Sequence, residues 1–144
     1  MKKNGFTLLE VLLTVATISI LATVSMPVYQ SFMVRNDLDI AAAEIAQSLG
    51  RAQALSTAMD GDTSWGVRSE SGRVVLFRGA SYVARDVAFD EVYSVPGSIF
   101  PSGVQEVVFT KFTGLPASTG AFILTSNTNE TRTITINSKG MVAY

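Results

Sequence analysis

Glu10 is the residue whose surroundings in the sequence give it unusual chemistry. It is the one charged side chain between Phe6 and Val34, and the next charge along the chain is Arg35. A charge at the centre of a membrane helix costs about 2.5–3.5 kcal/mol on insertion scales, and such residues usually have a partner and a function. Glu10 is therefore a candidate for a charge-assisted pair with a cation. The alternative is that it lies at the headgroup level of a membrane and is solvated there.

The residue types that most catalytic and metal sites need are missing. The 144 residues include no cysteine and no histidine, which excludes a disulfide, a Cys/His zinc site, a cysteine nucleophile and a histidine general base. A Ser–Lys or carboxylate mechanism remains conceivable, but the sequence offers no such constellation. The alternating carboxylates Asp60 and Asp62 are far from a complete oxygen cage for Ca²⁺. We therefore expect no enzyme activity, no cofactor and no metal site.

The charged residues are few and evenly balanced. Lys and Arg number 11 and Asp and Glu 12, and charged residues make up 16% of the chain against about 25% in an ordinary soluble domain. The hydrophobic share of 47% is ordinary, which indicates one very apolar segment attached to an otherwise ordinary chain. A net charge of -1 gives no basic field for nucleic acid, so DNA is not an expected partner.

The very apolar segment is residues 6–34. A hydrocarbon core about 30 Å thick needs roughly 20 apolar residues in a helix, and this segment is long enough. Lys2 and Lys3 precede it and should stay cytoplasmic, which sends the C-terminal bulk of the chain across the membrane. Pro27 removes a backbone hydrogen bond late in the helix and should kink or locally melt it. Alternatively, Pro27 marks the boundary between a membrane helix and a soluble helix.

Two other interpretations of this segment fit less well. A secretory signal peptide usually has an apolar core of about 7–15 residues that ends in a small-x-small site. This core is longer, and in Ala22-Thr23-Val24 the valine is a poor match for the small residue before the cut. A buried core helix of a soluble domain would have a polar face, which this segment lacks.

Residues 2–11, Lys-Lys-Asn-Gly-Phe-Thr-Leu-Leu-Glu-Val, form a specific motif. A short basic leader ends in Gly5, the aromatic Phe6 follows, and Glu10 stands four residues later. This pattern resembles the prepilin leader and N-terminus of type IV pilins and type II secretion pseudopilins, many of which carry a helix-breaking proline where Pro27 falls. The resemblance implies that a prepilin peptidase removes the leader, residues 1–5, on the cytoplasmic face and that Phe6 is then N-methylated.

The same resemblance implies where the mature chain resides. It would wait as a single-pass protein of the inner (cytoplasmic) membrane with an extracytoplasmic C-terminal domain, and would then enter an extracellular or periplasmic filament of pilin or pseudopilin subunits. Cleavage after Gly5 creates an α-amino group with a reference pKa near 7.7–8.0, which offers Glu10 a cationic partner on a neighbouring subunit. Because Phe6 and Glu10 are i and i+4, a pair within one subunit is also geometrically possible.

Residues 35–60 predict an amphipathic helix that packs one stripe on the globular domain. Its apolar side chains recur at three- and four-residue steps, at Leu38, Ala41, Ala42, Ile45, Leu49, Ala52, Leu55 and Met59. Gly61 and Asp62 end this helix, and we expect the helix of residues 6–34 to join it.

Residues 61–144 are typical of an antiparallel β domain. Short β-branched or aromatic runs predict strands at 65–68, 74–78, 104–112, 121–125, 132–136 and 141–144. The breaks between them hold glycine and proline, among them Pro96, Pro101 and Gly103. The predicted fold class is α+β, a long N-terminal α-helix packed on an antiparallel β-sheet or small sandwich, and the resemblance implies a pilin-like arrangement.

A second resemblance covers most of the chain. Short motifs are similar to those of the minor pseudopilin H and FimT-type proteins, namely residues 49–57, 65–67, 108–110 with Gly114, and 134–142. Some FimT-type proteins bind DNA through arginines beside the late glycine. Here that position has Lys139-Gly140-Met141-Val142 and lacks those arginines, which argues against specific DNA binding.

These features favour a structural subunit of a type IV pilus or type II secretion pseudopilus. The strand order and the missing cysteines favour a minor subunit. The alternatives are a pilin-like DNA-uptake receptor, the major pilin of a simple pilus, a membrane-tethered enzyme, and a signal-anchored protein that is never processed.

Overall fold

The computed structural model describes residues 5–144, except for the side chains of Val24 and Ser25. The chain divides into two compact units, residues 1–34 and residues 35–144. Lys2 and Lys3 of the predicted leader lie outside the described residues.

One helix, α1 (Leu8–Thr57), supplies the helical part of both units. It begins at Leu8, two residues after the predicted start at Phe6. The backbone stays helical through Pro27, so of the two effects predicted for this proline, local melting does not occur. A proline removes one backbone hydrogen bond. The hydrogen bonds of the helical turns on both sides, which form cooperatively, keep the backbone helical at this position.

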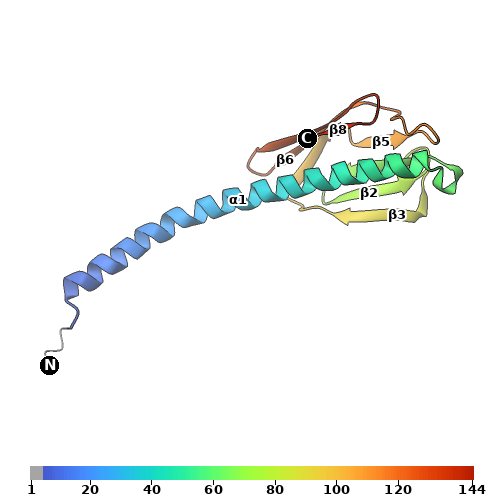
Figure 1. Cartoon of the computed structure of the whole chain (residues 1–144). Coiled ribbons are helices and arrows are strands. Elements are labelled where there is room, and N and C mark those ends of the chain that lie inside the picture. The colour runs from blue at the N-terminus through green and yellow to red at the C-terminus, as the bar shows by residue number, and fades with distance from the viewer. Residues whose placement is uncertain (1–4) are drawn as a thin grey trace. The chain divides into compact units, whose positions relative to one another are not determined.

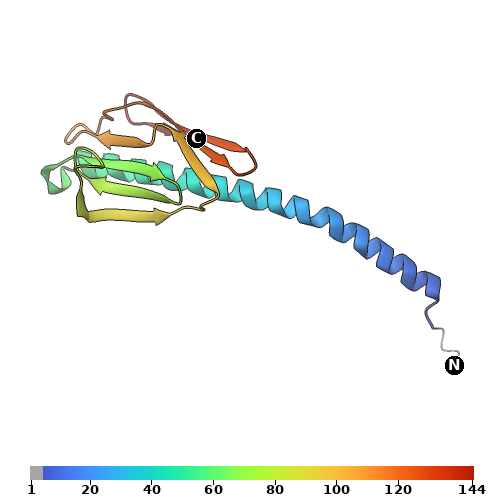
Figure 2. The same ribbon diagram turned by 180° about the vertical axis from the view of Figure 1, so that it is seen from behind.

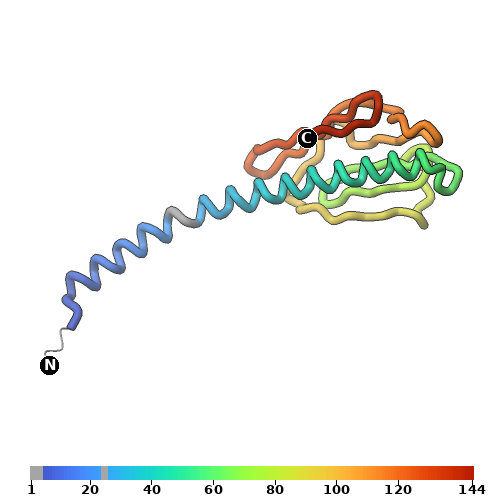
Figure 3. The backbone as a smooth tube through the Cα atoms, viewed as in Figure 1, coloured from blue at the N-terminus to red at the C-terminus, as the bar shows by residue number. Residues whose placement is uncertain are grey.

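The described part of the C-terminal unit contains eight strands in two antiparallel sheets. Sheet A has the order β3-β2-β1-β5, and sheet B has the order β4-β6-β7-β8. A short 3-10 turn, η1 (Asp60–Asp62), connects α1 to the first strand, as the backbone trace shows (Figure 3). The strands are β1 (Trp65–Glu70), β2 (Arg73–Arg78), β3 (Asp86–Ser94), β4 (Ile99–Gly103), β5 (Glu106–Phe109), β6 (Gly120–Ser126), β7 (Thr131–Ile136) and β8 (Val142–Ala143). The fold class is α+β, as predicted.

Two of these strands, β3 and β4, are absent from the sequence prediction. Acidic residues interrupt the apolar pattern of β3. Pro101 and Gly103, which are predicted to be breaks between strands, both lie in β4. The physical reason is the same for both strands, because each lies at the edge of its sheet. Edge strands tolerate charges and prolines, since one side of their backbone needs no ladder partner.

The core of the C-terminal unit lies between α1 and the two sheets (Figures 1 and 2). The predicted stripe on α1 is confirmed at six positions, where the side chains are buried: Leu38, Ala41, Ala42, Ile45, Leu49 and Ala52. Leu55 is half-buried, and Met59 is exposed because it follows the end of the helix. Alternate strand residues complete the core, including Trp65, Val67, Val74, Leu76, Phe109, Phe122, Leu124, Ile134 and Ile136.

Ser56 links α1 to two strands of sheet A. Its side chain is fully buried, and its Oγ donates to the carbonyl of Phe109 at 3.1 Å and accepts from the backbone N–H of Trp65 at 2.9 Å. The Trp65 indole N–H donates to the Asp60 carbonyl at 3.0 Å. One hydroxyl therefore satisfies two buried backbone groups and fixes the position of α1 on β1 and β5.

Replacing Ser56 with Ala should lower the free energy of unfolding by about 1–3 kcal/mol, because the Trp65 N–H and the Phe109 carbonyl both lose their side-chain partner inside the core. Urea unfolding of the full chain in a nonionic detergent, followed by the fluorescence of the one tryptophan, measures this change. Ser118 is exposed and donates to the Glu106 carbonyl at 3.5 Å, so Ser118→Ala is the matched control and should stay within about 0.5 kcal/mol of the parent. Equal stabilities of the two variants would contradict the assigned role of Ser56.

Candidate assembly site on the N-terminal helix

The large apolar side chains of residues 6–33 are exposed all along the N-terminal unit. Their exposed fractions range from 49% for Val11 to 82% for Phe6 and Leu8, and the set also includes Leu9, Leu12, Leu13, Val15, Ile18, Ile20, Leu21, Met26, Val28, Tyr29, Phe32 and Met33. Within the described residues, α1 is long and apolar enough to cross a membrane. Exposed apolar surface of this extent marks contact with a membrane or with other proteins.

The hydroxyl groups of this segment bond to its own backbone. The hydrogen bonds are 2.7–2.9 Å long and run from Thr14 to the Val11 carbonyl, from Thr17 to Leu13, from Ser19 to Val15 and from Thr23 to Ile20. A hydroxyl that lacks a partner in an apolar environment is costly. These back-bonded hydroxyls therefore fit a helix that is surrounded by hydrocarbon or by apolar side chains.

Glu10 lies in the first turn of α1. Thr7 precedes the helix, and its Oγ1 and carbonyl oxygen accept hydrogen bonds from the Glu10 N–H at 3.3 Å and 3.1 Å. Unpaired N–H groups at a helix N-terminus favour a nearby carboxylate. The Glu10 carboxylate forms no ion pair with any of residues 5–144, so its charge has no cationic partner within the described part of the chain.

Gly5 and Phe6 lie before α1, in a stretch without regular secondary structure. Both residues are exposed, so the bond that the sequence analysis predicts to be cleaved lies in accessible, non-helical backbone, which is where proteolysis concentrates. Because Phe6 is outside the helix, Phe6 and Glu10 do not share a helix face in the uncleaved chain. A pair within one subunit would involve the amine that cleavage creates, so that alternative stays a prediction.

Pro27 lies inside α1, and Ser31 Oγ donates to its carbonyl at 3.2 Å. A proline has no N–H, so it cannot donate to the carbonyl of Thr23 four residues earlier. The helix around Pro27 is thus the place where the backbone ladder of the N-terminal unit has a gap, although the chain remains helical there.

A second cluster joins α1 to two loops of the C-terminal unit. Gln53 Nε2 donates to the carbonyls of Gly114 and Lys139, at 3.1 Å each. Gly114 and Gly140 have φ of +62° and +79°, and an added Cβ would collide with Thr57 at Gly114 and with Gln53 at Gly140. We call Gln53, Thr57, Gly114, Lys139 and Gly140 the Gln53 cluster. In the sequence these residues lie in separate short motifs, and the structure brings them together in a packing role.

The arginines of sheet A and its loops are paired with carboxylates. The ion pairs join Arg68 to Glu70 and Glu106, Arg73 to Glu70, Arg78 to Asp86, and Arg85 to Asp90, at 2.6–3.2 Å. Guanidinium groups that are already neutralised offer little free positive charge to a phosphate backbone. Among residues 5–144 the structure shows no group of three or more acidic residues that could hold a metal ion.

Comparison with known proteins adds no family to this description. No family model matches the sequence, and no solved structure matches the fold. The chain itself supplies the functional evidence: an exposed apolar helix, a carboxylate in its first turn that has no ion pair among residues 5–144, and an accessible Gly5–Phe6 bond before it.

Proposed function

We propose that the chain is a structural subunit of a type IV pilus or a type II secretion pseudopilus. A prepilin peptidase cleaves after Gly5, and Phe6 becomes the N-methylated first residue of the mature subunit. The subunit waits in the inner membrane with its C-terminal unit outside the cytoplasm. It then polymerises through residues 6–34 into an extracellular or periplasmic filament, in which Glu10 pairs with the terminal amine of a neighbour.

The exposed apolar segment with a single carboxylate in its first turn is the observation that carries this proposal. Lipid can cover such a helix before assembly, and the same segments of neighbouring subunits can cover it afterwards. An apolar helix bundle has no strongly preferred axial register, because apolar contacts are non-directional. A desolvated ion pair is directional and strong, and it strands a charge when it is broken, so the Glu10–amine pair would set that register.

A minor subunit is the form of this role that we favour. The support comes from the order of the short motifs and the absence of cysteine. A DNA-uptake receptor is less well supported, because the arginines of sheet A are paired with carboxylates and the chain has a net charge of -1.

Mass spectrometry of the native N-terminus tests the proposal. We expect the mature protein to begin at Phe6 and to carry one added methyl group on the α-amine. The matched control is a Gly5→Leu variant, in which a bulky residue replaces the small residue before the cut, and it should keep Lys2 and Lys3. Mature wild-type protein that still carries Lys2 and Lys3 would contradict the proposed processing and favour an unprocessed membrane anchor.

A further inference from the structure

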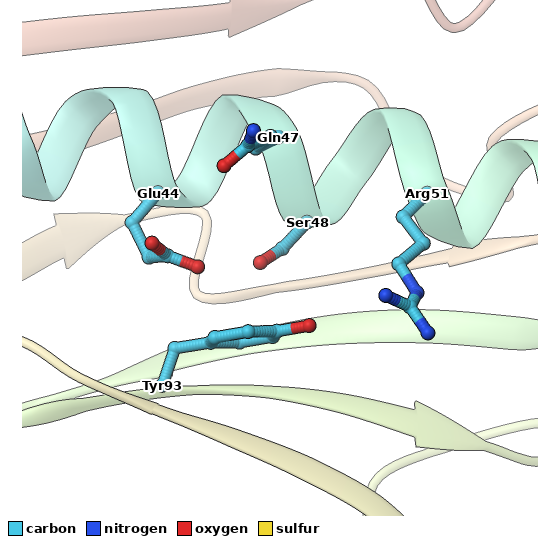
Figure 4. Close-up of a pocket in the computed structure, with 5 residues that line it drawn as sticks. All are labelled: Glu44, Gln47, Ser48, Arg51 and Tyr93. Atoms are coloured by element: carbon cyan, nitrogen blue, oxygen red, sulfur yellow. The ribbon is translucent and has the colours of Figure 1, made fainter.

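A cavity of about 310 Å³ lies between α1 and the edge strand β3, within the C-terminal unit. It is lined by Glu44, Gln47, Ser48, Arg51 and Tyr93. Figure 4 shows Glu44 and Ser48 extending from α1 toward the side on which Tyr93 lies, with a face of the tyrosine ring turned toward the helix. The volume is at the lower end of the range of small-molecule sites, so a short aliphatic chain with a polar end would fill it.

The Ser48 hydroxyl has no partner although it is buried. The residue is 2% exposed, and its Oγ makes no hydrogen bond. A serine inside a helix usually donates to the carbonyl three or four residues earlier, as the back-bonded hydroxyls of the N-terminal unit do. An unsatisfied buried hydroxyl costs free energy. The unpaired Ser48 Oγ at this cavity therefore indicates a site for a hydrogen-bonding ligand.

Among the charged groups at the cavity, the carboxylate of Glu44 has no ion-pair partner among the described residues. Arg51 Nη2 pairs with Glu91 Oε1 at 2.7 Å, and the Tyr93 hydroxyl donates to Glu91 Oε2 at 2.7 Å. Arg51 and Glu91 therefore neutralise each other. Glu44 is half-buried and forms no ion pair or hydrogen bond through its side chain with the residues that the structure describes. Arg51, the cation that lines the cavity, is engaged by Glu91, so Glu44 keeps a carboxylate without a partner among the described residues.

The groups around Tyr93 raise the pKa of its hydroxyl group. Its hydrogen bond to Glu91 raises the pKa of the Tyr93 hydroxyl, and burial and the negative charges of Glu91 and Glu44 raise it further, while Arg51 opposes the shift. The tyrosine therefore stays protonated and neutral at physiological pH. A neutral phenol ring presents a negative π-face, which attracts a cation within about 6 Å of the ring centre.

We propose that this cavity binds a primary ammonium group. The carboxylate of Glu44 supplies the counter-charge, the unpaired Ser48 Oγ accepts an N–H, and the Tyr93 ring receives the cation on its face. An ammonium group carries three N–H donors and no acceptor, which matches three electron-rich groups around one small space. The source is either a free amine or a lysine side chain of a protein that approaches the open edge of β3. This inference does not depend on the role in a filament.

Titration of the full chain with n-butylammonium in nonionic detergent micelles tests the inference, with ¹H–¹⁵N NMR as the readout. We expect saturable chemical-shift changes confined to residues 44–51 and 91–93. Glu44→Gln should weaken binding by at least about tenfold, because it removes the counter-charge and keeps the shape of the side chain. Ser48→Ala should weaken it by about threefold or more, because it removes one hydrogen-bond acceptor.

Asp37→Asn is the matched control, because it removes one negative charge from α1 two turns before Glu44 and should leave the affinity unchanged. The uncharged analogue n-butanol controls for partition into the micelle. Spermidine and a short lysine-containing peptide separate the two sources, since tighter binding of the first indicates a free polyamine and tighter binding of the second indicates a protein lysine. Shifts that do not saturate, that n-butanol reproduces, or that persist unchanged in a folded Glu44→Gln variant would overturn the inference.

Discussion

Full-length protein with Glu10→Gln is expected to reach the membrane but to enter filaments less than the wild type by a factor of about one hundred or more. Removing one partner of a buried ion pair costs about 3–5 kcal/mol in proteins generally, because the other charge stays buried without compensation. In the proposed filament that charge is the N-methylated amine of Phe6 on a neighbouring subunit. Glutamine preserves the size of the side chain, so a defect would report the lost charge. Quantifying the protein in sheared filaments and in membranes measures the effect.

Two controls separate pairing from general damage to α1. Thr17→Val changes a neighbouring polar residue of the same segment, whose hydroxyl bonds only to carbonyls of its own helix, and it should assemble normally. Unchanged Trp65 fluorescence should show that the C-terminal unit of Glu10→Gln stays folded, because this residue is 4% exposed in the core. Wild-type filament yield from Glu10→Gln would argue against the ion pair as the basis of assembly.

Gly140→Ala is expected to lower the free energy of unfolding by about 2–5 kcal/mol. A non-glycine residue in the left-handed conformation costs about 1–2 kcal/mol, and Gly140 has a φ of +79°. The added methyl group would also collide with the Gln53 side chain, which holds the carbonyls of Gly114 and Lys139. Displacing that side chain breaks two hydrogen bonds, each worth about 0.5–1.5 kcal/mol. Urea unfolding in nonionic detergent, followed by tryptophan fluorescence, gives the measurement.

A control glycine and a double variant separate the two causes. Gly72 has a φ of +84° with open space where a Cβ would lie, so Gly72→Ala should show the backbone cost alone, about 1–2 kcal/mol. In a Gln53→Ala background the clash at position 140 disappears, so Gly140→Ala should then cost about as much as Gly72→Ala. Additive effects of Gln53→Ala and Gly140→Ala would show that the two residues are not coupled and would contradict the Gln53 cluster.

The helical part of the fold could be predicted because its signals are local. The uncharged stretch between Glu10 and Arg35 predicts a long apolar helix, and the three- and four-residue spacing from Leu38 to Ala52 predicts the buried stripe. The candidate assembly residues follow from the same local pattern, since a small residue, an aromatic residue and a carboxylate stand within six positions of one another. The structure adds the start of α1 at Leu8 and its passage through Pro27.

The parts that escaped prediction depend on contacts between distant residues. Nothing near Pro101 indicates that β4 lies at a sheet edge, where a proline is tolerated. Gln53 bonds to Gly114 and Lys139, which are separated from it by 61 and 86 positions in the sequence. No local sequence pattern therefore predicts its role. The cavity beside Tyr93 combines a helix and a strand more than 40 positions apart, and in the sequence Glu44 and Ser48 are ordinary polar positions of an amphipathic helix.

The back-bonded hydroxyls of the N-terminal unit affect the free energy of moving this helix between a lipid bilayer and a bundle of apolar helices. Thr14, Ser19 and Thr23 each donate within α1, so their hydrogen bonds remain the same whichever molecules surround the helix. Acyl chains and packed aliphatic residues are then nearly interchangeable solvents for this segment. In the proposed assembly, moving residues 6–34 from lipid to packed helices would therefore change the free energy little, and one polar attraction at the end of the helix would favour the filament.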